Sequence, residues 1–165
     1  MDAPGHIVDG LSSDQGYTIG VSLMQPYSRG TVRLANGDPA SAPVLDPNYF
    51  GDERDMATML AGMNIAREIG QAPALAPWRG EELAPGPKED SREYVRRTLA
   101  SYCHPVGTCK MGTDDQSVVD PDLCVYGVDG LRIADASVIP AIPSANTVAT
   151  VYVIAERAAE LISSR

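Results

Sequence analysis

The stretch Ser101-Tyr-Cys-His-Pro-Val-Gly-Thr-Cys-Lys-Met-Gly112 brings one of only two histidines in the sequence, His104, into a loop rich in proline and glycine. A side chain in such a loop is placed by its surroundings and not by a helical or strand repeat. Histidine as a residue type exchanges its proton near neutral pH, which suits a general base. His104 is therefore a candidate base, and a histidine that is hydrogen-bonded within a turn is the alternative.

A second polar residue stands near the end of the chain, in Pro143-Ser-Ala-Asn-Thr147. The spacing predicts a final helix from about Asn146, with an apolar stripe of Val148, Val151, Tyr152, Ala155, Ala159 and Ile162. Unpaired N–H groups at a helix N-terminus favour an anionic group docked there. The alternative is that Asn146 or Ser144 only caps the helix.

Composition limits the possible functions. The chain has 165 residues with a net charge of −9, which argues against nucleic-acid binding and against an anionic membrane surface as partner. There is no apolar run of about 18 residues, so no membrane span is predicted, and the first residues lack a secretory signal pattern. Three cysteines without C-x-x-C spacing predict no metal site and reduced thiols, hence a cytoplasmic location.

The remaining pattern predicts short strands and helices that are separated by turns and loops. Strands are expected at 17–24 and 31–34, followed by an Asn36-Gly37 turn and a loop over 43–51. A helix should begin at Asp52 or Asp55 and end at Gly70, and a shorter one should follow a capping box at Asp90. Segments 118–119, 123–128 and 131–134 read as short strands.

Motifs for other chemistries are missing from the sequence. It contains no G-x-S-x-G elbow, no P-loop and no G-x-G-x-x-G after a strand. The acidic pairs Asp114-Asp115 and Asp120-Pro-Asp122 are typical of solvated turns. Nucleophilic hydrolysis and phosphate binding are thus not indicated.

Several ordered motifs resemble the C-terminal region of the glucose–methanol–choline (GMC) FAD-dependent oxidoreductases. They are His104 to Gly112, Val125-Tyr-Gly-Val-Asp-Gly-Leu-Arg-Ile-Ala-Asp-Ala-Ser-Val-Ile-Pro140, Pro143 to Thr147, Pro26-Tyr-Ser-Arg-Gly-Thr-Val-Arg-Leu34 and Asp46-Pro-Asn-Tyr49. The resemblance covers nearly the whole chain from about Tyr17 and is nearest to choline dehydrogenase-like members.

The resemblance implies a role for each matching residue. His104 matches the catalytic histidine and Asn146 its partner position, which is His or Asn in the family. Asp135 and Ala136 match residues near the FAD pyrophosphate and ribitol, whereas Asn146, Thr147 and Val148 match the helix start beside the flavin pyrimidine. Members oxidise a small-molecule alcohol to a carbonyl, with the hydroxyl proton taken by the histidine and a hydride taken by FAD.

The resemblance also implies a division of the chain. Residues 1–130 should form the substrate-binding domain, which in such proteins is an α+β fold with a mixed or antiparallel sheet and flanking helices. Residues 131–165 should supply the last strand and helix of the FAD-binding domain. The Gly-rich N-terminal half of that domain is missing from this sequence, so the chain is expected to be a fragment or to work with a separately encoded half. Alone it should bind FAD weakly or not at all. A non-catalytic interaction module and a lyase-type member are the alternatives.

Overall fold

The computed structural model describes residues 16–164, which form two compact units. The first contains Phe50–Tyr102 together with the described residues up to Leu23, and the second contains Met24–Tyr49 and the chain from Cys103 onward. A short antiparallel pair of strands and several helices occur together, which is compatible with the α+β class. No helix within residues 16–164 is long and apolar enough to cross a membrane.

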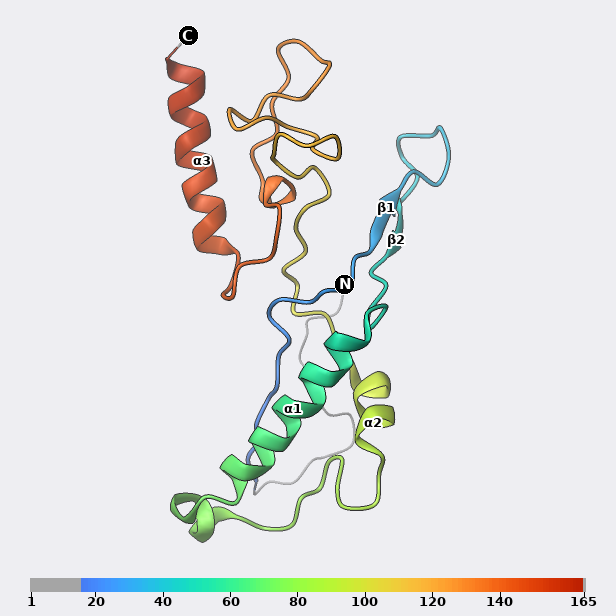
Figure 1. The fold of residues 1–165 in the computed structure, drawn as a ribbon, viewed down its shortest axis with the longest axis vertical. Coiled ribbons are helices and arrows are strands. Elements are labelled where there is room, and N and C mark those ends of the chain that lie inside the picture. Colours follow the sequence, from blue (N-terminus) through green and yellow to red (C-terminus); the bar gives the residue numbers. More distant parts are fainter. Residues whose placement is uncertain (1–15, 165) are drawn as a thin grey trace. The chain divides into compact units, whose positions relative to one another are not determined.

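Two helices form the core of the first unit (Figure 1). Helix α1 (Glu53–Gly70) begins after Asp52, whose carboxylate accepts from the Arg54 N–H at 3.0 Å. Helix α2 (Ser91–Thr98) begins after Asp90, which accepts from the Glu93 N–H at 3.0 Å. The helices bury Met56, Met63 and Val95 together. Both predicted helices are confirmed, and the proline-rich segment between them contains the 3-10 helix η1 (Pro73–Trp78).

The predicted strand at 17–24 is wrong, since no strand is present in that part of the described chain. Strand β1 (Thr31–Arg33) pairs instead with β2 (Val44–Asp46), in a segment expected to be a loop, and Val32 lies opposite Leu45. The turn between them explains the pairing. Asn36 and Asp38 accept backbone N–H bonds two residues on and reverse the chain, so that the segment after the turn returns alongside β1.

Single bridges replace the three short strands expected in the second unit. Met111 pairs with Val119, Val119 with Val125, and Cys124 with Arg132. The Asp120 carboxylate accepts from the N–H groups of Asp122 and Cys124 at 2.9 and 2.8 Å, which bends the chain before a ladder can extend. The expected strand at 131–134 is therefore reduced to one bridge, and its place in an FAD-binding domain stays a prediction.

Helix α3 (Val148–Ser163) buries a different face from the one predicted. Ala158 is 5% exposed and joins Val119, Leu123 and Val138 in the core, with Ile154 and Leu161 packed beside it. Most of the expected stripe is exposed, including Tyr152 at 69% and Ile162 at 60%. With about 3.6 residues per turn, the two faces lie roughly 100° apart on the helix. Both faces are apolar, and packing selected between them.

Candidate functional site

The histidine loop is fixed against the segment that leads to α3, within the second unit. The Cys109 N–H donates to the Ser137 carbonyl at 3.0 Å, and the Met111 N–H donates to the Val138 carbonyl at 2.8 Å. Gly107 has φ +88°, and a Cβ there would lie 3.3 Å from the Ile139 carbonyl oxygen. The close approach of the two backbones depends on this glycine.

His104 meets the start of α3. Its Nδ1 atom lies 3.4 Å from Oγ1 of Thr147, although the two residues are 43 positions apart in the chain. Thr147 is 8% exposed and His104 is half-buried. The sequence predicted Thr147 as a cofactor contact but missed its contact with the histidine. Its position directly after Asn146 was the available clue.

Asn146 lies one residue before this contact and is exposed. The alternative, that Asn146 or Ser144 caps α3, is wrong, because the cap is Thr147, which has helical φ and ψ and makes no side-chain cap hydrogen bond. The structure therefore brings His104, Thr147 and, by adjacency, Asn146 and Val148 into one region. Their roles in catalysis or cofactor binding stay predictions.

Asp135 caps the short 3-10 helix η2 (Ala136–Val138), of which Ala136 is the first residue. Its Oδ1 atom accepts from the Ser137 N–H at 2.8 Å. Hydrogen bonds from the Ser137 side chain and backbone hold the pKa of the Asp135 carboxyl below its usual value. The carboxylate is thus charged at neutral pH and serves to cap η2. The backbone of this short helix in turn accepts the hydrogen bonds from the histidine loop.

The N-terminus of α3 suits an electron-rich ring edge such as the flavin pyrimidine. Within this described helix, the first turn holds no acidic residue and no side-chain cap. The positive end of the helix dipole is therefore not offset by its own side chains. This helix end is therefore compatible with an electron-rich group, and the contacts of Thr147 and Val148 with FAD stay a prediction.

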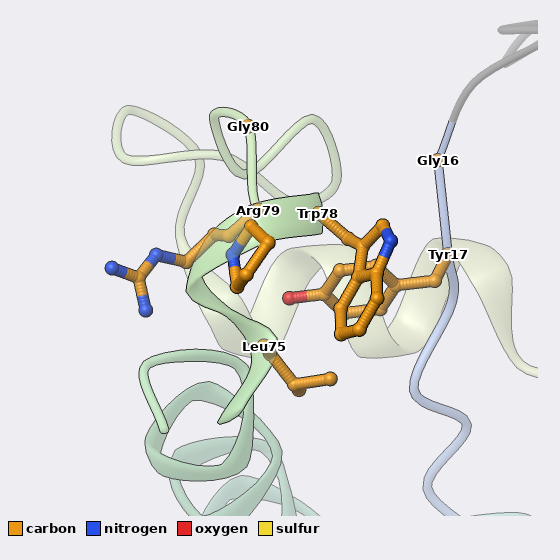
Figure 2. A pocket seen from close by; sticks show the side chains of 7 residues that line it. Gly16, Tyr17, Leu75, Trp78, Arg79 and Gly80 are labelled. Atoms are coloured by element: carbon orange, nitrogen blue, oxygen red, sulfur yellow. The ribbon is translucent and has the colours of Figure 1, made fainter. Parts of the chain in front are cut away.

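A separate hollow lies in the first unit and has a volume of about 740 Å³. Its lining includes Tyr17, Leu75, Pro77, Trp78 and Arg79. Figure 2 shows the Tyr17 and Trp78 rings and the Leu75 side chain at the hollow, whereas the Arg79 side chain extends away from the rings. None of these residues belongs to the predicted site.

Comparison with curated proteins gives extended matches. The chain is 44% identical over 161 residues to choline oxidase of Arthrobacter globiformis, a match that covers 93% of this chain and 30% of that protein. It is 42% identical over 151 residues to alcohol dehydrogenase [acceptor] of Pseudomonas putida, covering 89% and 27%. The chain thus spans 30% or less of the length of these two relatives.

Solved structures agree with these matches. Pyridoxine 4-oxidase from Mesorbium loti superposes with a TM-score of 0.78 at 32% identity, over 86% of this chain and 28% of that one. An FAD-dependent oxidoreductase from Chaetomium thermophilum also gives a TM-score of 0.78, at 33% identity, over 86% and 25%. The family model described as GMC oxidoreductase matches residues 26–155. The chain therefore belongs to the GMC oxidoreductase family and corresponds to the C-terminal region of its members.

Proposed function

We propose that the chain is the C-terminal catalytic portion of a GMC-type flavoprotein that oxidises a primary or secondary alcohol to a carbonyl compound, with His104 as the base. The observation that carries this is the 3.4 Å contact between Nδ1 of His104 and Thr147 at the start of α3. The residue matched to the base and the helix start matched to the flavin meet in one unit. The relatives' names, choline oxidase and alcohol dehydrogenase, favour an alcohol as substrate.

In this proposal His104 takes the proton from the substrate hydroxyl, so that the O–H bond breaks and an N–H bond forms on the imidazole. Asn146, one residue from the contact, orients the hydroxyl through its side-chain amide. FAD, when bound, would supply the acceptor for the hydride that leaves the substrate carbon.

The exposed apolar face of α3 supports a further element of the proposal, a partner half that carries most of the FAD-binding surface. Tyr152, Ala155, Ala159 and Ile162 form this face with Val148, at the spacing of a helix-packing seam. A continuous apolar face of this kind marks an interaction surface. The partner half is either joined to this region or separately encoded. A cytoplasmic location and the domain boundary at residue 130 stay predictions.

The decisive test compares His104→Ala with His6→Ala, the only other histidine, in the chain combined with an FAD-binding half of a relative. Loss of a general base should slow reduction of the flavin by alcohol by roughly 10²–10⁴-fold. His6→Ala should leave the rate unchanged. Stopped-flow absorbance of the flavin measures both rates. Equal rates for the two variants would remove His104 from the chemistry.

A control distinguishes the enzyme from a non-catalytic interaction module. The chain alone should retain little FAD, because most contacts of the cofactor lie outside this region, and addition of the partner half should restore retention. A module without flavin chemistry predicts complex formation without bound FAD and indifference to His104→Ala. Tight FAD retention by the chain alone would contradict the shared-site proposal.

A further inference from the structure

We propose that Thr147 is a positioning residue that holds His104 in the tautomer with the proton on Nδ1, so that the basic lone pair lies on Nε2. The inference deepens the proposed function and rests on it for its catalytic meaning. It names a role in the site that differs from the cofactor contact expected of Thr147. The geometry that carries it lies within one unit of the fold.

Both partners are held in place by backbone contacts. The Thr147 carbonyl accepts from the Val151 N–H at 3.0 Å, which anchors the residue to the first turn of α3. The histidine loop is anchored by the bonds of Cys109 and Met111 to the segment before α3. Thr147 is 8% exposed, so water has little access to its hydroxyl. The Nδ1–Oγ1 distance of 3.4 Å is longer than the roughly 2.7–3.2 Å of most N–H···O bonds, and long contacts of this kind are common in active sites that hold no substrate.

A threonine hydroxyl can donate or accept, so the tautomer of His104 decides which of the two side chains donates the hydrogen bond. If Oγ1 donated to Nδ1, the imidazole proton would lie on Nε2, and neither nitrogen would be available as a base while the bond lasted. If Nδ1–H donates to Oγ1, the Nε2 lone pair is the basic one. The second arrangement also persists after Nε2 gains a proton, because Nδ1–H remains a donor and its bond becomes charge-assisted. The site then needs no reorganisation during proton uptake.

Imidazole nitrogen NMR of the full 165-residue chain tests the tautomer directly, since only two histidines contribute and His6→Gln assigns the signals. The wild-type chain should show His104 mainly with the proton on Nδ1. Thr147→Val, which keeps the shape and removes the hydroxyl, should lower the ratio of the Nδ1–H to the Nε2–H form by roughly 2- to 13-fold, the factor that a net hydrogen bond of about 0.5–1.5 kcal/mol gives. Thr147→Ser, which keeps the hydroxyl, should restore the ratio.

Two results would overturn the proposal. One is a wild-type His104 mainly in the Nε2–H form, which requires no variant to fold. The other is an unchanged ratio in a Thr147→Val chain whose far-UV circular dichroism matches the wild type. In the reconstituted enzyme, Thr147→Val should lower kcat with little change in KM, and Thr147→Ser should restore it.

The outcomes also separate this proposal from the proposed function. The expected tautomer shift without any alcohol oxidation would leave the positioning contact in place and defeat the enzyme proposal. Loss of activity in His104→Ala together with an unchanged tautomer ratio in Thr147→Val would do the reverse.

Discussion

Leucine at Ala158 or at Ala159 tests which face of α3 packs against the rest of the second unit. Ala158 is 5% exposed and packs among Val119, Leu123 and Val138. Ala159 belongs to the apolar stripe predicted from the sequence and is exposed. The same three carbon atoms are added at neighbouring positions of one helix. Helix propensity differs little between alanine and leucine, so it nearly cancels from the comparison.

The expected difference follows from the packing. Ala158→Leu forces extra volume into a filled core and should cost about 1–3 kcal/mol, or roughly 5- to 150-fold in the folding equilibrium. Ala159→Leu enlarges a side chain that contacts no buried cluster of the described unit and should change the free energy of unfolding by less than about 0.5 kcal/mol. The matched position therefore serves as the control.

Urea unfolding followed by far-UV circular dichroism measures both variants. Ala158→Leu should lower the midpoint at an unchanged slope, because the surface exposed on unfolding stays the same. An equal loss in the two variants, or a larger loss for Ala159→Leu, would refute the assignment of the buried face. Ala159→Leu should in turn weaken assembly with an FAD-binding half, since it alters the exposed face proposed for that partner.

Three further predictions concern the local structure. Hydrogen bonds from Arg54 lower the pKa of Asp52 from 3.8 to about 2, so its contribution to stability is present at neutral pH and lost as the pH falls from 3.8 to about 2; Asp52→Asn should flatten this part of an acid unfolding curve. Asp90→Ala should cost about 1 kcal/mol in urea unfolding by removing the cap of α2, and Asp90→Asn should retain most of that stability. Gly107→Ala should cost roughly 1–2 kcal/mol, because φ is +88° and the Ile139 carbonyl is close, whereas Gly37→Ala, with open space around it, should be nearly neutral in the same assay. A Gly107→Ala chain as stable as the wild type would contradict the close approach of the histidine loop.

The helices α1 and α2 could be predicted because their determinants are local. Asp52 and Asp90 lie within three residues of the N–H groups whose hydrogen bonds they accept. Met56 and Met63 are seven residues apart, so they lie on the same face of one helix. The hairpin could be predicted only in part. The turn at Asn36 is local, but nothing in the pattern around Val44 distinguishes a short exposed strand from a loop.

The site shows the same division. The residues that match the family's motifs are read directly from the sequence, and the GMC assignment confirms the resemblance that they carried. The contact between His104 and Thr147 spans 43 positions and depends on backbone bonds made by Cys109 and Met111, which no spacing rule gives.

The sequence by itself determined the family, the starts of α1 and α2 and the identity of the candidate base, because these depend on residue types and on neighbours a few positions apart. The tertiary structure alone decided which of two apolar faces of α3 is buried and that β1 pairs with β2. It also decided that His104 contacts Thr147, and that Thr147 and not Asn146 is the cap residue of α3. The physical reason is that burial and long-range hydrogen bonds are settled by competition among partners across the chain. In α3 the outcome depended on which side chains could fill the space around Val119 and Val138, a quantity that the periodicity of one helix does not contain.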